Sequence, residues 1–287
     1  MAKHSYLLGH PIAHSKSPAL YAAAYGALGL DWEYGLVDRD NEADAWEFIR
    51  AAEWLSINIT TPWKRLGIQA TSRVSVEALL AHGANLLINC NGAISADNVD
   101  GKGCAAFLRR SGFDFEGANV AVCGTGPTAR AIMYACARQG VGRVTLLGRD
   151  AARCAETLEG VNDVLWNQPT LECELAAQAY DQAKDTLTNA QLIIDATPLG
   201  MKPGDPAPFD TSLLHEGHVV LDVVYGHGET QLVADARAAG CTVYDGGGML
   251  VGQAVETVWA LAQATGAFDV PEDLDLFQIM ADGAGLA

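Results

Sequence analysis

Short apolar runs alternate with segments of helical periodicity along most of the chain. In the first hundred residues the pattern predicts strands at 5–9, 34–37, 56–60 and 86–90 and helices at 18–28, 42–51 and 75–81. From residue 118 onward it predicts strands at 119–123, 144–147, 192–195, 219–222 and 242–244 and a helix at 128–139. This alternation is typical of an α/β protein with largely parallel sheets.

Two parts of the chain fit this pattern less simply. The stretch from 160 to 188 has no clear period, and it stays unassigned. The last forty residues are predicted to be helical, with one helix over 249–264 and another that begins at Pro271. The length of 287 residues allows one or two domains.

The charge balance narrows the choice of partners. The formal net charge is −17, and no basic stripe compensates for it, which excludes nucleic acid and anionic membranes as partners. No run of 18 apolar residues is present, so no membrane span is expected. The seven cysteines have no CxxC spacing, which predicts free thiols in the cytoplasm and no metal site. A phosphate-bearing ligand would need local cations or backbone N–H groups.

One segment offers such N–H groups. Cys123-Gly124-Thr125-Gly126-Pro127-Thr128-Ala129 places a Gly-x-Gly turn between a predicted strand and a predicted helix. The first glycine permits the tight turn, and the second lets the backbone approach a pyrophosphate at the helix N-terminus. The third glycine of the usual dinucleotide fingerprint is missing. A tight strand–helix turn that binds no ligand would look similar.

The next predicted strand ends in Gly148-Arg149-Asp150-Ala151-Ala152-Arg153. An acid at this strand end usually binds the ribose hydroxyls of NAD, whereas arginine accommodates the 2′-phosphate of NADP. Asp150 directly follows Arg149, so the signal is mixed, and Asp150 is also a candidate helix N-cap. On so acidic a chain, two arginines four residues apart favour NADP.

Three segments of the first hundred residues carry polar side chains at loop positions. Ser15 and Ser17 lie two apart before a helix and suit a carboxylate, although Ser17 alone would serve as an N-cap before Pro18. Lys64 follows a strand, at the edge where α/β sheets gather ligands. The segment Asp97–Gly103 reads by itself as a turn or a helix start. None of these segments is specific alone.

Taken together and in order, five segments resemble the shikimate dehydrogenase family. They are Gly9-x-Pro11-Ile12-x-His14-Ser15-Lys16-Ser17-Pro18, Asn58-Ile59-Thr60-x-Pro62-x-Lys64, Asp97-Asn98-Val99-Asp100-Gly101, Asp195-Ala196-Thr197-Pro198-Leu199-Gly200-Met201 and Gly248-Met249-Leu250-Val251-x-Gln253-Ala254. The resemblance covers residues 5 to about 265. It implies two open, mostly parallel α/β domains with a cleft between them.

The resemblance also implies domain limits. Residues 1–102 with 247–287 would form a discontinuous, substrate-binding catalytic domain. Residues 103–246 would form a Rossmann-type domain that binds NADP, with NAD as the less favoured cofactor.

The roles of single residues follow from the same resemblance. Lys64 matches the family's catalytic lysine and Asp100 its catalytic aspartate; Lys64 would exchange the proton and Asp100 would orient it. The implied substrate-binding residues are Ser15, Ser17, Thr60, Asn85, Tyr225 and Gln253. The implied cofactor-binding residues are Gly124, Thr125, Gly126, Pro127, Thr128, Arg149, Arg153, Thr197 and Gly246.

The implied activity is reversible NADP-linked hydride transfer between 3-dehydroshikimate and shikimate, in the biosynthesis of aromatic amino acids. The ligand would be a small cyclic hydroxy acid, and the protein a monomer or homodimer. Two alternatives stay open: a quinate or aminoshikimate dehydrogenase of the same family, and a non-catalytic NADP-binding regulator.

The chain departs from the family pattern at three places. The usual Gly-Ala-Val-Asn-Thr is here Gly83-Ala84-Asn85-Leu86-Leu87, so either Asn85 takes the asparagine's place or the contact is lost. Val99 replaces a threonine beside Asp100, and Asp195 replaces a common asparagine. If the missing threonine hydroxyl faces the substrate, Val99→Thr should tighten binding. These departures leave the exact substrate open.

Overall fold

A computed structural model describes residues 3–166, 168 and 171–286, and the chain forms two compact units. The first unit comprises the residues up to Gly103 and those from Val251 onward, and the second comprises Cys104–Leu250. The boundaries expected from the sequence were 102/103 and 246/247. In the described residues, no helix is both long and apolar enough to cross a bilayer.

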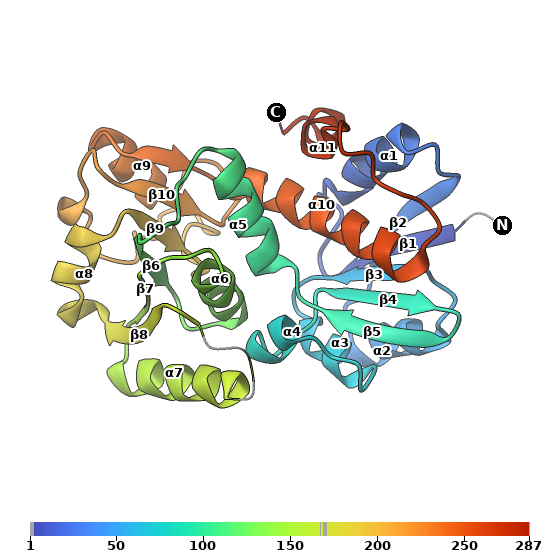
Figure 1. Ribbon diagram of the computed structural model, residues 1–287, viewed down its shortest axis with the longest axis horizontal. Coiled ribbons are helices and arrows are strands. Elements are labelled where there is room, and N and C mark those ends of the chain that lie inside the picture. Colours follow the sequence, from blue (N-terminus) through green and yellow to red (C-terminus); the bar gives the residue numbers. More distant parts are fainter. Residues whose placement is uncertain (1–2, 167, 169–170, 287) are drawn as a thin grey trace. The chain divides into compact units, whose positions relative to one another are not determined.

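The first unit is built on a five-stranded sheet in the order β2-β1-β3-β4-β5 (Figure 1). Its strands are β1 (Lys3–Gly9), β2 (Trp32–Asp38), β3 (Ser56–Ile59), β4 (Leu86–Cys90) and β5 (Ala93–Asp97). The first three pair in parallel, whereas β4 runs antiparallel to β3 and β5 antiparallel to β4. Both antiparallel pairings involve β4, whereas the other four strands share one direction. The strand β5 was not predicted by the hydrophobic pattern.

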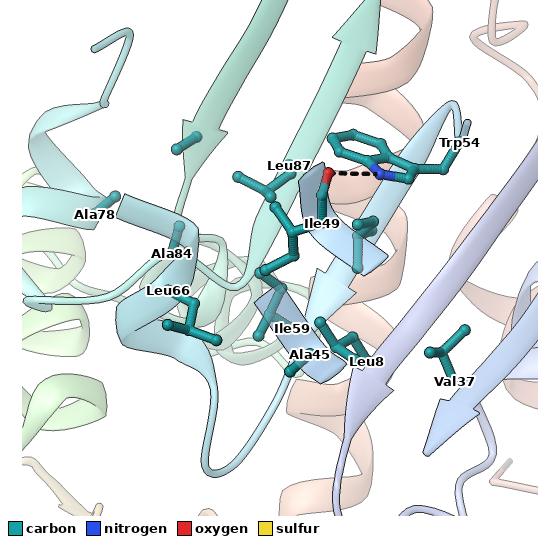
Figure 2. Packing of buried hydrophobic residues seen from close by; sticks show 12 residues of the cluster. Leu8, Val37, Ala45, Ile49, Trp54, Ile59, Leu66, Ala78, Ala84 and Leu87 are labelled. Atoms are coloured by element: carbon teal, nitrogen blue, oxygen red, sulfur yellow. Dashed lines mark hydrogen bonds between the residues drawn. The ribbon is translucent and has the colours of Figure 1, made fainter. Parts of the chain in front are cut away.

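Helices complete this unit. They are α1 (Ser17–Ala27), α2 (Glu42–Ala51), α3 (Lys64–Gln69), α4 (Val76–Leu80), the later part of α10 (Gly246–Thr265) and α11 (Leu276–Ala284). A hydrophobic cluster of the sheet and its helices includes Leu8, Ile49, Ile59 and Leu87 (Figure 2). Trp54 packs in the same cluster and donates its indole N–H to the carbonyl of Ile49 at 3.2 Å. Burial of these side chains supplies the main driving force for this unit.

Two helix starts differ from the sequence expectation. Ser17 is the first residue of α1 and not its N-cap, and its backbone N–H donates to Ser15 Oγ at 3.2 Å. Pro271 does not open a helix, because α11 begins at Leu276 with Asp275 as its cap. A serine two residues upstream and a capping aspartate satisfy the N–H groups that these helix starts leave open.

The second unit contains a six-stranded, fully parallel sheet in the order β11-β10-β9-β6-β7-β8. The strands are β6 (Asn119–Cys123), β7 (Arg143–Gly148), β8 (Glu174–Ala179), β9 (Leu192–Asp195), β10 (Val219–Asp222) and β11 (Thr242–Tyr244). The helices are α5 (Asp100–Arg110, from Cys104 onward), α6 (Pro127–Ala137), α7 (Ala151–Leu165), α8 (Lys184–Asn189), α9 (Gln231–Ala238) and the first turn of α10. The crossover between β6 and β9 creates the switch point at which such sheets bind ligands.

The segment that the sequence left unassigned now has a structure, apart from residues 167, 169 and 170, which lie outside the described residues. It holds the end of α7, the strand β8 and the start of α8. The β8 sequence Glu-Leu-Ala-Ala-Gln-Ala contains no β-branched or aromatic residue, so its strand character comes from pairing with β7.

Candidate active site

The predicted catalytic pair is in direct contact in the first unit. Lys64 opens α3 just after β3, and Asp100 opens α5 just after β5. Lys64 Nζ donates to Asp100 Oδ2 at 2.7 Å. Asp100 is 2% exposed, and the lysine side chain is 24% exposed. A buried carboxylate therefore holds an ammonium group that still reaches solvent on one side, as a proton-exchanging group requires.

Asn85 completes this arrangement. Its Nδ2 donates to Asp100 Oδ1 at 2.7 Å, and its Oδ1 accepts the backbone N–H of Val99 at 2.8 Å. The neighbouring Leu86 is fully buried in a hydrophobic cluster. In the segment Gly83–Leu87, which departs from the family pattern, Asn85 and not Leu86 therefore lies beside the Lys64–Asp100 pair. With Lys64 and Asn85 as donors, both oxygens of the Asp100 carboxylate have partners.

Asn58 is linked to this cluster through the backbone of Asn85, and the sequence analysis had given it no role of its own. The hydroxyls of Tyr21 and Tyr34 donate to Asn58 Oδ1 at 3.0 and 2.9 Å. Asn58 Nδ2 donates to Thr257 Oγ1 at 3.1 Å and to the carbonyl of Asn85 at 3.4 Å. Burial raises the pKa of both tyrosines, so they remain neutral donors. The sequence feature that could have pointed to Asn58 was a single amide side chain within the otherwise apolar run of β3.

The other predicted substrate residues of the first unit lie at strand ends or on α10. Ser15 Oγ donates to Ser17 Oγ at 3.2 Å in the segment between β1 and α1. Thr60 directly follows β3, which is the parallel neighbour of β1. Gln253 lies on α10 against Gly103 of α5, where any side chain at position 103 would collide with it. The glycine therefore lets α10 approach the start of α5, three residues from Asp100.

The structure places the side chain of Val99, whose direction the sequence left open. Its side chain is 1% exposed and packs with Leu86, Ile88 and Leu261 in a hydrophobic cluster. The condition under which Val99→Thr would tighten binding is therefore not met, because this side chain packs in an apolar cluster while its backbone N–H donates to Asn85 Oδ1.

We expect Val99→Thr to lower the free energy of unfolding by about 1–3 kcal/mol, since a hydroxyl would enter an apolar cluster without a partner. Urea unfolding measures this loss. The same substitution at half-buried Val76 should cost less. Unchanged stability of Val99→Thr together with a lower KM for a hydroxylated substrate would show that a hydroxyl at position 99 does face the substrate.

The glycine turn of the second unit has the geometry of an anion site. Gly124 has a φ of +115°, and a Cβ there would lie 3.1 Å from the carbonyl oxygen of Ala196. Gly126 is the N-cap of α6 and Pro127 its first residue, and no side chain caps this helix. The first N–H groups of an uncapped helix point outward with the positive end of the helix dipole, which suits a pyrophosphate.

One arginine contacts this turn, and the two predicted phosphate-binding arginines follow β7. Asp150 caps α7 by accepting the backbone N–H of Arg153 at 2.7 Å, so its carboxylate is engaged in the cap. Arg149 is the residue that precedes this cap in the sequence. Arg130, which the sequence analysis missed, donates from Nε to the carbonyl of Thr125 at 3.3 Å. Burial and the positive charge of Arg153 lower the pKa of Arg130. The sequence feature that could have pointed to Arg130 was its position four residues after Gly126, the second glycine of the turn.

The remaining predicted residues follow β9 and β10. Thr197 donates its backbone N–H to Asp195 Oδ1 at 2.8 Å, and its Oγ1 accepts the N–H of Leu199 at 3.2 Å. Tyr225 lies three residues after β10, and burial raises the pKa of its hydroxyl. Gly246 begins α10 and donates to the carbonyl of Val224 at 3.2 Å. With Gly124, these segments lie at the carboxyl edge of the sheet.

Among the described residues, no group of three or more His, Cys, Asp or Glu side chains is arranged to hold a metal ion. The candidate site residues are the Lys64–Asp100–Asn85 cluster in the first unit and the glycine turn and arginines in the second.

Comparison with known proteins identifies similar sequences. Residues 7–87 match the family model of the shikimate dehydrogenase substrate binding domain. The NADP(+) shikimate dehydrogenase of Alkaliphilus metalliredigens is 32% identical over 253 residues, covering 86% of this chain and 87% of the relative. That of Symbiobacterium thermophilum is 35% identical over 251 residues, covering 86% of this chain and 84% of the relative.

Solved structures resemble the whole fold. The 5-ketofructose reductase of Gluconobacter sp. strain CHM43 has a TM-score of 0.80 at 28% identity and covers 99% of this chain and 98% of its own. The shikimate 5-dehydrogenase of Thermus thermophilus, solved with NADP(H) and shikimate, has a TM-score of 0.80 at 26% identity with the same coverage.

The fold and the site together define an oxidoreductase of the α/β class with a Rossmann-type domain. Within that class the chain belongs to the shikimate dehydrogenase family.

Proposed function

We propose that this protein catalyses the reversible, NADP-linked interconversion of 3-dehydroshikimate and shikimate. The observation that carries the proposal is the cluster in which Lys64 and Asn85 both contact the buried carboxylate of Asp100. The relatives named NADP(+) shikimate dehydrogenase, which align over most of the chain, supply the substrate and the cofactor of the proposal.

The cluster suits proton exchange at the reacting oxygen. NADPH, when bound, supplies the hydride for reduction. As the carbonyl carbon of 3-dehydroshikimate is reduced, Lys64 Nζ gives a proton to the oxygen that becomes the hydroxyl, and in oxidation the proton returns to Nζ. Asp100 and Asn85 keep Nζ in one place, because Asp100 accepts from both of them. Positioning of this kind lowers the barrier without additional chemistry.

Ser15 and Ser17 are proposed to bind the substrate carboxylate. Their hydroxyls lie 3.2 Å apart in the segment that joins β1 to α1. Hydrogen bonds to a charged group contribute about 1.5–3 kcal/mol each. Shikimate methyl ester should therefore have a kcat/KM at least about tenfold below that of shikimate. Equal use of the ester and the acid would refute the role of the two serines.

A second candidate activity is reduction of a related polyol ketone, because the 5-ketofructose reductase has the same fold at 28% identity over nearly the whole chain. A panel of shikimate and quinate with NADP, and of 5-ketofructose with NADPH, separates the candidates. The proposal expects shikimate to have the highest kcat/KM. A higher value for either of the others would reassign the substrate. If the protein turned over none of these substrates but still bound NADP, the result would support the alternative of a non-catalytic NADP-binding regulator.

We further propose that the protein acts in the cytoplasm on its small-molecule substrate, as a monomer or homodimer. The seven cysteines are free thiols, and four of them are buried, which is the usage expected in a reducing compartment.

A further inference from the structure

Two aspartates end neighbouring strands of the second unit and lie side by side. Asp195 is the last residue of β9 and Asp222 the last residue of β10, and they are register partners in the parallel sheet. Register partners on adjacent parallel strands are about 4.8 Å apart and direct their side chains to the same face. Asp195 is 1% exposed and Asp222 is fully buried. Two carboxyl groups are thus buried next to each other.

Each carboxyl group fastens the loop that follows its strand. Asp195 Oδ1 accepts the N–H of Thr197 at 2.8 Å. Asp222 Oδ1 accepts the N–H of Val224 at 2.9 Å, and its Oδ2 accepts the hydroxyl of Thr230 at 2.6 Å. These bonds fix the backbone that leads to Thr197 on one side and to Tyr225 on the other.

The two loops also contact each other. The N–H of Val223 donates to the carbonyl of Asp195 at 3.0 Å. Gly200, in the loop after β9, lies against the methyl group of Thr230, which is itself bonded to Asp222. A change at either carboxyl group is therefore passed to both loops.

The surroundings disfavour two negative charges. Among the described residues, the titratable groups that interact with the pair are Cys123 at the end of β6, Tyr180 after β8 and Asp245 after β11, and none of these three is a cation. Burial raises the pKa of both aspartates. The charge of Asp222 adds to the shift at Asp195, whose pKa rises to about 7, and the charge of Asp245 adds to the shift at Asp222. Burial also raises the pKa of Cys123 and Tyr180, which remain neutral. Carboxyl pairs so placed hold one proton between them.

We propose that Asp195 and Asp222 are positioning residues that carry one negative charge between them, and that their retained proton keeps the loops bearing Thr197 and Tyr225 in place. This inference rests on the proposed function for the roles of Thr197 and Tyr225. When the proton is lost to water, two adjacent buried charges repel each other. The loops then loosen, and both the Kd for NADP and the KM for the substrate rise.

The test compares the unmodified protein with Asp195→Asn, whose amide keeps the shape and the acceptor for Thr197 but cannot ionise. The Kd for NADP is measured by fluorescence titration at pH 6 and pH 8.5. We expect the Kd of the unmodified protein to rise about tenfold more over this interval than that of Asp195→Asn, the change that corresponds to one pK unit of coupling. Asp205→Asn is the matched control, since Asp205 only fastens the N–H groups of Gly200 and Lys202 in the same loop, and it should behave like the unmodified protein.

The unmodified protein provides a second measurement that needs no variant. Carboxyl ¹³C resonances of labelled aspartate should include one that titrates near pH 7 and that is absent from Asp195→Asn. Equal pH dependence of the NADP Kd in both proteins, or ionisation of every aspartate below pH 5, would overturn the inference. Neither measurement uses shikimate turnover, so failure of the proposed substrate would leave this result interpretable.

Discussion

Replacing Lys64 with methionine should lower kcat for shikimate oxidation by about 10²- to 10⁴-fold, because the reacting oxygen loses its proton-exchanging group. The thioether side chain matches the lysine as far as Cε but lacks the ammonium group and carries no exchangeable proton. The Kd for NADP should remain within about twofold, since the glycine turn and the arginines belong to the other unit of the chain. Steady-state kinetics and a cofactor titration measure the two quantities on the same preparation.

Arg65→Met is the matched control for this experiment. Arg65 is the next residue in α3, is 62% exposed and forms a surface ion pair with Glu42 at 3.3 Å. Such pairs contribute little to stability, so kcat should be unchanged. If Lys64→Met retained kcat within threefold of the unmodified protein, the assignment of Lys64 would be wrong.

Replacing both Arg149 and Arg153 with alanine should raise the Kd for NADP by about 100-fold, on the basis of about 1.5 kcal/mol for each charged hydrogen bond to the 2′-phosphate. The Kd for NAD should change by less than about threefold, because NAD lacks that phosphate. Isothermal titration with both cofactors gives the ratio directly.

The control for the arginine pair is Arg138→Ala, at the exposed carboxyl end of α6, away from the glycine turn. It should leave both cofactors unaffected. A double variant in which NADP and NAD weaken equally would show that the arginines act on the pyrophosphate or on the fold. Preference of the unmodified protein for NAD would mean that Asp150 binds the ribose.

The core strands could be predicted because burial on both faces leaves an unbroken apolar run. The strands β6, β9 and β10 have the limits that the sequence analysis expected. The alanine-rich β8 and the short β5 could not be predicted, because each owes its conformation to a neighbouring strand. Ser17 shows a similar limit at a single residue, since Lys16 takes the N-cap position and Ser17 starts the helix, which depends on how the chain enters α1.

The site illustrates the same division. Lys64 and Asp100 are 36 residues apart in the chain, and only the family resemblance indicated that they belong together before the structure showed their 2.7 Å contact. Asn58 and Arg130 escaped the sequence analysis because their partners come from distant segments or from a loop carbonyl. The direction of the Val99 side chain stayed open, because the direction of a side chain in a loop cannot be read from sequence spacing.

The measurement that tests the account most directly is the stoichiometry of the forward reaction. Protein, NADP and shikimate are mixed, NADPH is followed by absorbance, and the organic product is identified by NMR. We predict that one molecule of 3-dehydroshikimate appears for each NADPH and that neither appears at a comparable rate with Lys64→Met. No NADPH from shikimate under conditions where NADP is bound, or a product oxidised at another carbon, would contradict the account.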